Sequence, residues 1–402
     1  MKKDFIFFSE SVTEGHPDKL CDQISDAIVD RFLQQDPASA IVAECAVSTG
    51  IVFIAARFAS DAVVDISQVA RRVIDAVGYD QPDFNANTCT IVTSLRDLPR
   101  GHRLAFDERG MSAAEFDAIP VRNAVTAFGF ACDQTATLMP MPIHIAHQLA
   151  RRLTTVRREK TLPYLMADGS VQVGVEFRDR QPRRVHSITV VASQNLPTSS
   201  GGPNIGRFGS ELREAVIESV LKDMGVRADE DTQINVNPDG AFLVGGPSLH
   251  SGLTGRKNAI DTYGEYSRHS GSALSGKDPS RIDRVGAYAA RYAAKNVVAA
   301  GLASECEVQL SYMIGQARPV SLQVETFGTG TIDDGKIAGL LHKFFDFRLG
   351  GILQEFGLRF RPSTAKDGFY QKLAAYGQMG RSDIEVPWER TDKAALLGEF
   401  KT

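Results

Sequence analysis

The sequence predicts an α+β protein built from three similar units, and two observations support this fold class. Its 402 residues exceed what a single core usually holds, and a prior of about 150 residues per domain gives two or three domains. Each of three successive segments also combines strand-like alternation with at least one amphipathic helix. The repeated order of helix, paired strands and helix therefore favours three similar α/β-sandwich units.

The first unit, residues 1–100, is expected to begin with a helix. Ile24 and Ile28 are four residues apart and lie on one face of a helix expected over 23–35. The other elements expected here are two strands within 41–58, joined at Thr49-Gly50, a helix over 65–79 and a strand over 88–95.

The second and third units, residues 123–232 and 233–375, repeat this order. In the second unit we expect a helix over 141–158, strands over 170–177 and 186–194, and a helix over 210–224. In the third unit we expect a strand over 232–238, a glycine-rich stretch over 240–280, helices over 282–301 and 333–345, and strands over 306–314 and 320–328.

Two segments lie outside these units. Residues 101–122 are rich in charge, Pro and Gly and lack a sustained period, which indicates a long loop and a candidate lid. The tail, residues 376–402, is polar and holds the only Trp, Trp388; we expect it to pack on the surface.

Composition and charge exclude several classes of protein. A formal net charge of −4 at pH 7 argues against a dedicated nucleic-acid binder, which usually carries a basic excess. The five cysteines are odd in number and free of any CxxC pair, so a reducing cytoplasm is expected. No stretch approaches the ~18 apolar residues of a membrane span, and the apolar part of the N-terminus is too short for a signal peptide.

A first candidate site lies in residues 10–26, which read "ESVTEGHPDKLCDQISD". This stretch crowds metal-binding and phosphate-binding side chains around a Gly and a Pro, just ahead of a helix. Asp18 could hold a divalent cation that bridges phosphates, and His16 could donate a hydrogen bond to a ribose or phosphate oxygen. The residues alone equally allow that this turn merely caps the helix.

A second candidate site lies in the glycine-rich stretch and in the helix start behind it. Fixed cations among glycines suit a polyphosphate, because charged side chains and exposed main chain can contact it together. Asp283 is a second candidate ligand for a bridging divalent cation. Neither a Walker pattern nor GxGxxG is present. The cations are Arg256, Lys257, Lys277, Arg281 and Arg284.

Two more histidines, His144 and His147, stand three residues apart on the helix expected over 141–158. This spacing is compatible with a metal, but no carboxylate or Cys stands beside them. A packing role is therefore expected.

Several long motifs carry a resemblance to a known family. They are "SESVTEGHPDKLCDQISDA", "FGFACDQTATLMPMPI", "GLTGRKNAIDTYG", "SGKDPSRIDR" and "CEVQLSYMIG". On these motifs the chain resembles the S-adenosylmethionine synthetase (methionine adenosyltransferase) family over essentially its whole length. The resemblance implies three interleaved α+β domains with pseudo-threefold symmetry, and a homodimer or homotetramer with active sites at the dimer interface.

The resemblance also implies a reaction and its site residues. ATP is the substrate with Mg²⁺ and K⁺, and a thioether sulfur attacks C5′ of ATP while the whole triphosphate leaves. His16 would stabilise the leaving group, Asp18 and Asp283 would hold Mg²⁺, and Glu44 would bind K⁺. The other implied ATP contacts are the phosphate clamps Arg256, Lys257 and Lys277, the adenine contact Phe242, and Ala273.

Several positions depart from the family's pattern, mostly on the acceptor side. Arg57 stands where the family has a Glu that receives the methionine amino group, and His250 replaces an Asp shared between methionine and ATP. Ser170 replaces a catalytic Lys beside the phosphates. The remaining changes are Asn123 for an Asp, Leu98 for a Gln that touches methionine, Ala241 for an Arg that contacts ATP, and Arg281 for a Lys.

These departures leave three interpretations open. The first is an ATP-dependent adenosyltransferase that acts on methionine or, preferentially, on a different nucleophile, since Arg57 and His250 suit an acidic acceptor. The second is an impaired member that serves as an oligomer partner or hydrolyses ATP or tripolyphosphate. The third is ordinary S-adenosylmethionine synthesis with compensation from Lys160, Arg122 or Arg103.

Overall fold

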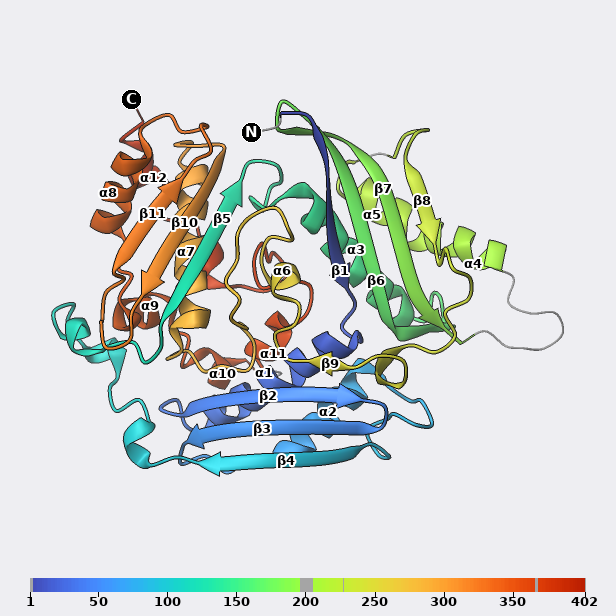
Figure 1. The fold of residues 1–402 in the computed structure, drawn as a ribbon, viewed down its shortest axis with the longest axis horizontal. Helices are drawn as coiled ribbons and strands as arrows, with labels where there is room; N and C mark the ends of the chain where they lie inside the picture. Colours follow the sequence, from blue (N-terminus) through green and yellow to red (C-terminus); the bar gives the residue numbers. More distant parts are fainter. Residues whose placement is uncertain (1–2, 196–204, 227, 366–367, 402) are drawn as a thin grey trace.

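Three open β-sheets surround a central group of helices and loops in the computed structural model (Figure 1). The structure describes residues 3–195, 205–226, 228–365 and 368–401. The strand orders are β1-β6-β7-β8, β11-β10-β5 and β4-β3-β2-β9. The strands are β1 Phe5–Val12, β2 Ala40–Ser48, β3 Ile51–Ala59, β4 Thr90–Asp97, β5 Val125–Cys132, β6 Leu165–Arg178, β7 Gln181–Gln194, β8 Gln233–Val236, β9 Gly252–Leu253, β10 Glu305–Tyr312 and β11 Ser321–Glu325.

The sheets do not follow the three consecutive segments expected from the sequence. β1 pairs antiparallel with β6 of the central segment, β5 pairs with β10 of the third, and β9 of the third pairs with β2 of the first. The β1-β6-β7-β8 sheet therefore contains strands from all three segments, and each of the other two sheets contains strands from two. This is the interleaving that the family resemblance implies.

Helices cover one face of each sheet. α1 packs on β2, α3 packs on β1 and β6, and α7 packs on β5 and β10. The helices are α1 Pro17–Gln35, α2 Ile66–Val77, α3 Met141–Arg158, α4 Ile205–Leu212, α5 Ser219–Asp223, α6 Asn258–Asp261, α7 Ile282–Ala299, α8 Asp334–Phe344, α9 Leu349–Phe356, α10 Arg361–Thr364, α11 Tyr370–Leu373 and α12 Ala394–Gly398.

Most expected elements are present, several of them with shifted ends. The helix expected over 141–158 is α3, and the two strands within 41–58 are the antiparallel pair β2 and β3. The helix expected over 210–224 is instead α4, a π-helical turn over Arg213–Glu218, and α5. Local alternation gave no expectation of β1, β5 or α9.

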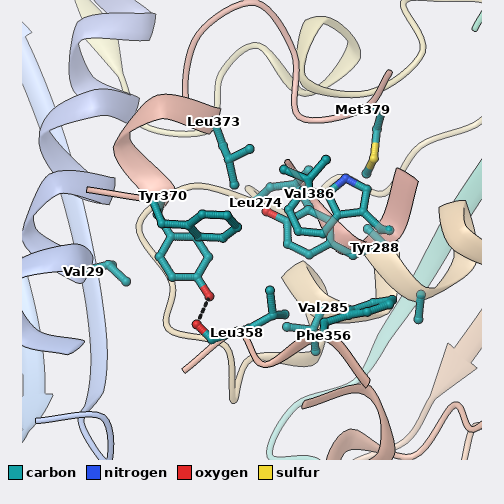
Figure 2. Close-up of a cluster of buried hydrophobic side chains, with 14 of the residues drawn as sticks. Val29, Leu274, Val285, Tyr288, Phe356, Leu358, Tyr370, Leu373, Met379 and Val386 are labelled. Atoms are coloured by element: carbon teal, nitrogen blue, oxygen red, sulfur yellow. Dashed lines mark hydrogen bonds between the residues drawn. The ribbon is translucent and has the colours of Figure 1, made fainter. Parts of the chain in front are cut away.

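The C-terminal residues enter the core, so the expectation that residues 376–402 pack on the surface is wrong. Trp388 is fully buried and stacks on Tyr288 of α7, with ring centroids 3.7 Å apart. Figure 2 shows this apolar cluster, in which the Tyr370 hydroxyl of α11 donates a hydrogen bond to the Leu358 carbonyl. An aromatic side chain of this size buries a large apolar area, which outweighs the polar character of the rest of the tail.

The loop over residues 101–122 is anchored to the third segment. Arg359 Nη1 donates hydrogen bonds to the buried Glu108 carboxylate at 2.6 Å and to the Phe106 carbonyl at 2.7 Å. Phe116 is buried, and its 3₁₀ turn packs on α9. A role for this loop as a lid stays a prediction.

Helix α1 carries a row of buried carboxylates, here called the aspartate ladder. A four-residue spacing places them on one face of the helix. Each carboxylate accepts backbone N–H groups of the third segment, so the ladder holds the first and third segments together. The members and their donors are Asp18 with Leu253, Asp22 with Gly255, Asp26 with Gly276, and Asp30 with Tyr370 and Gln371.

Buried cations form ion pairs with the two middle carboxylates of the ladder, Asp22 and Asp26. Arg284 of α7 is fully buried and forms a two-pronged ion pair with Asp26, at 2.7 and 2.9 Å. Lys19 is also buried and pairs with Asp22 and Asp261. Much of the charge in the "DKLCDQISD" stretch therefore organises the fold.

Candidate functional site

The histidine cluster, composed of His16, Asp168 and His250, joins three distant parts of the chain. His16 precedes α1, Asp168 lies in β6, and His250 follows a 3₁₀ turn before β9. His250 Nε2 lies 3.0 Å from Asp168 Oδ2, and the rings of His16 and His250 have centroids 4.9 Å apart. An expected ATP-binding residue and an altered acceptor residue therefore meet within one chain.

Close backbone contacts explain why glycines flank this cluster. A Cβ at Gly15 would lie 2.3 Å from the Ala167 carbonyl oxygen, and a Cβ at Gly252 would lie 2.2 Å from the carbonyl group of Pro17. Only glycine allows such an approach. The turn before α1 consequently lies directly against β6 and β9, which places His16 beside Asp168.

His16 does cap α1, as one of the two sequence interpretations states. It is the N-cap residue, and its Nδ1 accepts a hydrogen bond from the Asp18 backbone N–H at 3.2 Å. The Asp18 carboxylate also accepts the Leu253 N–H, and Arg256 Nη1 lies 3.9 Å from the same oxygen. Capping uses the Asp18 backbone and not its carboxylate, so it is compatible with ligand binding.

The lysine cluster, composed of Asn123, Lys277 and Asp283, is the second polar group. Asn123 Nδ2 donates to Asp283 Oδ1 at 2.6 Å, and Lys277 Nζ lies 3.3 Å from Asp283 Oδ2. An Asp at position 123 would face Asp283 as a like charge, whereas the amide makes a hydrogen bond. Asn123 Oδ1 is buried and has no hydrogen-bond partner within the described ranges, so it is left as an acceptor.

The histidine cluster and the lysine cluster lie near different turns of α1. Asp18 belongs to the first turn, whereas Asp26 accepts the N–H of Gly276, the residue before Lys277. Eight residues of helix span about 12 Å. Among the described residues, the Asp18 carboxylate contacts Leu253, His16 and Arg256, whereas the Asp283 carboxylate contacts Asn123 and Lys277. The two carboxylates expected to bind Mg²⁺ therefore have different contact partners within one chain.

The remaining ATP-side residues lie near β1 and the glycine-rich stretch. Lys257 Nζ pairs with Glu10 of β1 at 3.2 Å. Phe242 is half-buried, and its carbonyl accepts the N–H of Gln194. Ala273 is half-buried and lies against Gly255, which has a positive φ of 75° and whose Cβ would meet the Ala273 side chain.

Glu44 and Arg57 lie on the exposed face of the β4-β3-β2-β9 sheet, called here the outer face. Both side chains are exposed. Ile51 and Phe53 alternate with buried residues along β3 and share this face with Val92 of β4, at 53%, 43% and 44% exposure. Apolar side chains gathered on an open sheet face mark an interaction surface.

The other altered positions are scattered. Leu98 follows β4 and donates its N–H to the Phe58 carbonyl. Ser170 lies in β6 between Val12 of β1 and Val191 of β7. Arg281 is the N-cap residue of α7, and Ala241 is half-buried beside Phe242. Leu98 therefore lies near Arg57 at the end of β3 and β4, whereas Ser170, Ala241 and Arg281 lie on other parts of the chain.

Sequence reasoning missed Asp168, the partner of His250, and Glu10, the partner of Lys257. Asp168 stands two residues before Ser170 in "ADGSVQV" and is 4% exposed. A carboxylate at the start of an apolar strand is a signal that could have been used. Its pairing with His250 depends on a contact between distant segments and is absent from the local pattern.

Burial and hydrogen bonding set the charge states in the two clusters. Burial lowers the pKa of His16 to about 4, against the opposing effect of Asp168 and Asp18. The hydrogen bond to Asp168 raises the pKa of His250. Burial also lowers the pKa of Lys277, although Asp283 opposes this shift. His16 is therefore neutral at neutral pH, and its Nε2 carries the proton because Nδ1 accepts a hydrogen bond.

His144 and His147 of α3 pack against other side chains, as expected. His147 Nδ1 lies 2.8 Å from the Ser11 hydroxyl, and His144 Nδ1 lies 3.3 Å from the Thr137 hydroxyl. In the described ranges, the group of His, Cys, Asp or Glu side chains close enough to hold a metal is the histidine cluster, which contains neither His144 nor His147.

None of the described helices is both long and apolar enough to cross a membrane.

Comparisons with known proteins identify the class. Family models for the S-adenosylmethionine synthetase N-terminal, central and C-terminal domains match residues 4–98, 118–242 and 244–390. The chain belongs to the S-adenosylmethionine synthetase family.

Curated relatives cover the whole chain. An S-adenosylmethionine synthase of Microcystis aeruginosa is 47% identical over 412 residues, covering 100% of this chain and 99% of the relative. One from Crocosphaera subtropica (strain ATCC 51142 / BH68) is 46% identical over 409 residues, covering 99% and 98%.

Proposed function

We propose that this protein is an ATP-dependent adenosyltransferase in which an acceptor nucleophile attacks C5′ of ATP and expels tripolyphosphate. Family membership and the names of the relatives support the reaction class. The observation that carries the proposal is a division within the site: three phosphate-side cations, Arg256, Lys257 and Lys277, and both candidate Mg²⁺ carboxylates are present, whereas most of the altered positions lie on the acceptor side.

On the phosphate side, Arg256, Lys257 and Lys277 would neutralise the leaving tripolyphosphate, and neutral His16 would donate its Nε2–H to it. Such fixed donors cost no reorganisation as charge develops. Asp18 and Asp283 offer carboxylate oxygens, the ligands that Mg²⁺ prefers, so the residues fit the ion. Mg²⁺ would supply charge neutralisation of the phosphates. Glu44 offers the same donor type for K⁺.

We propose that two copies complete each site. Among the described residues, no hydrogen bond or ion pair joins the histidine cluster to the lysine cluster, yet binding of the triphosphate would use His16 of the first and Lys277 of the second. The apolar outer face offers a surface for a second copy, because burying it removes Ile51, Phe53 and Val92 from water. Glu44 and Arg57 lie on this face and would then enter the partner's site.

We propose that the acceptor is acidic and differs from methionine. Arg57 replaces a Glu that would bind an ammonium group, which changes the local charge by two units. At an effective dielectric near 20, two like unit charges ~4 Å apart repel by ~4 kcal/mol. A carboxylate or phosphate on the acceptor would instead pair with Arg57.

Titration calorimetry and turnover test this proposal. The protein is titrated with an imido analogue of ATP and Mg²⁺, and adenosyl transfer is then followed with methionine and with acidic thiols, thioethers and amines. We expect nucleotide binding and transfer to an acidic acceptor. Failure of the nucleotide to bind would overturn the proposed function, and tight methionine binding would overturn the altered acceptor.

A second candidate is an impaired family member that acts as an oligomer partner or hydrolyses ATP or tripolyphosphate. Ser170 favours it, since a hydroxyl cannot neutralise phosphate charge as the family's Lys does. Binding of the nucleotide with no adenosyl product from any acceptor would support this candidate.

Compensation by neighbouring cations has less support, because Arg103 is paired with Asp36 and Asp61. Of the other two, Arg122 donates to the His102 carbonyl, and Lys160 is exposed beyond α3.

A further inference from the structure

The contact between His250 and Asp168 has the form of an oriented acid–base pair. The Asp168 carboxylate is buried, and its Oδ2 accepts the Gly246 N–H at 2.7 Å as well as the His250 Nε2 bond at 3.0 Å. The His250 side chain is 37% exposed. A buried carboxylate that fixes Nε2–H leaves Nδ1 of the neutral ring as a free base.

His16 stands beside this pair in a different role. Its Nδ1 accepts the Asp18 N–H, so its Nε2 carries a proton and acts as a donor. The ligand atoms of His16, Asp168 and His250 lie within 4.8 Å of one another, close enough to consider a metal ion. The hydrogen bonds favour an acid–base pair, because an ion bound through Asp168 Oδ2 would have to displace two N–H donors.

We propose that His250, positioned by Asp168, is the general base for an acceptor whose nucleophilic atom carries a proton, such as a thiol or an amine. This inference rests on the proposed function, since it places the acceptor of adenosyl transfer beside His250. The base would touch the reacting atom, and Asp168 would be a positioning residue.

The chemistry distinguishes such an acceptor from a thioether. A thioether has no proton to lose and becomes a sulfonium cation when it attacks C5′. A thiol attacks C5′ while His250 Nδ1 takes its proton; the C5′–O5′ bond breaks and its electron pair leaves on the tripolyphosphate. The products are a neutral thioether, tripolyphosphate and a protonated imidazole, so atoms and charge balance. A base is therefore useful only in the second case.

The groups around His250 suit this role. Asp168 of β6 and Asp18 of α1 raise its pKa, whereas Lys257 before α6 and burial oppose them, and the neutral ring of His16 lies alongside. General bases work best when their pKa lies near the working pH. We expect the rate with a thiol to rise with pH as His250 loses its proton.

A matched pair of acceptors tests the proposal directly. 3-Mercaptopropionate and 3-(methylthio)propionate share a carboxylate and differ by one methyl group on sulfur. With Mg²⁺ and ATP, we expect adenosyl transfer to the thiol to exceed transfer to the thioether at least tenfold. Equal transfer, preference for the thioether, or no transfer to the thiol while the nucleotide is bound would each overturn the inference. Failure of the wild type to bind nucleotide would instead overturn the proposed function.

Variants separate a base from a structural residue. His250→Asn should lower the rate with the thiol by about 10²–10⁴-fold near neutral pH. The loss should shrink as pH rises, because the thiol then ionises in solution. His342→Asn, an exposed change on α8, is the control and should leave both rate and pH profile unchanged. A loss for His250→Asn that stays constant across pH would contradict a base.

A chelator tests the metal alternative. 1,10-Phenanthroline binds transition metals but leaves Mg²⁺ in place, and 1,7-phenanthroline is its non-chelating isomer. We expect both compounds to leave the thiol activity intact. Loss with the 1,10 isomer alone would assign a metal to the histidine cluster and overturn the inference.

Discussion

The aspartate ladder and the histidine cluster both involve α1, yet they differ in whether their side chains keep a polar atom that can bind a ligand. In the ladder, Asp22, Asp26 and Asp30 are buried, and their carboxylates accept bonds from the same chain. In the histidine cluster, His250 is part-exposed and keeps a ring nitrogen. Asp18 belongs to the ladder yet lies beside the cluster. The number of partners within the fold therefore distinguishes the roles of charged residues in a short motif. Those whose polar atoms are all paired stabilise the fold, and those that keep an unpaired polar atom can bind a ligand.

The largest expected effect is a loss of stability when the Asp26–Arg284 ion pair of the ladder is broken. Asp26→Asn removes the charge that balances fully buried Arg284, and breaking a buried ion pair costs about 3–5 kcal/mol. Urea unfolding followed through the fluorescence of Trp388 measures the change. Asp75→Asn on α2 is the exposed control and should change the free energy of unfolding by less than about 0.5 kcal/mol. A cost below about 1 kcal/mol for Asp26→Asn would contradict a scaffold role.

The next effect concerns a part-buried imidazole with no carboxylate partner among the described residues. Burial lowers the pKa of His144 to about 4, so the folded state keeps it neutral while the unfolded state takes up a proton near pH 6.5. Stability is then complete above about pH 6.5 and falls between pH 6.5 and 4, by up to about 3 kcal/mol. In denaturant titrations across this range, His144→Gln should reduce the slope. An unchanged slope, matching the exposed control His342→Gln, would refute the assignment.

Asp18→Asn tests whether the first carboxylate of the ladder contributes to nucleotide binding or to the stability of the fold. The amide oxygen can still accept the Leu253 N–H, so we expect the free energy of unfolding to change by less than about 1 kcal/mol. Binding of the ATP analogue with Mg²⁺ should weaken at least tenfold, about 1.4 kcal/mol. Calorimetry and urea unfolding measure the two effects. A large loss of stability with normal binding would make Asp18 another scaffold carboxylate.

The smallest expected effect concerns acceptor choice. Arg57→Glu combined with His250→Asp restores the family's charges, and we expect it to raise any methionine-dependent activity several-fold. Arg96→Glu combined with His250→Asp is the matched control, because Arg96 lies directly beside Arg57 on β4 and this double variant makes the same charge change. If both variants gave the same increase, long-range charge and not local contact would explain it.

The sequence predicted elements with strong local periods and missed features that depend on distant contacts. Helix α3 is amphipathic over its whole length, so 141–158 was expected with the observed bounds. β1 was missed because its partner β6 lies in another segment, and the burial of Trp388 depends on stacking with Tyr288. The motifs drew attention to His16 and His250, but the contact of His250 with Asp168 beside His16 depends on the folded chain.

A mixed dimer tests the central claim that the two clusters of different copies complete each site. One chain carries Asp18→Asn and the other Asp283→Asn, and the differently tagged dimer is purified and titrated with the ATP analogue and Mg²⁺. One site combines both changes, while the other keeps Asp18 of one chain and Asp283 of its partner. We therefore predict one nucleotide bound per mixed dimer. No bound nucleotide would show that the clusters work within a single chain, and two would show that neither carboxylate is needed.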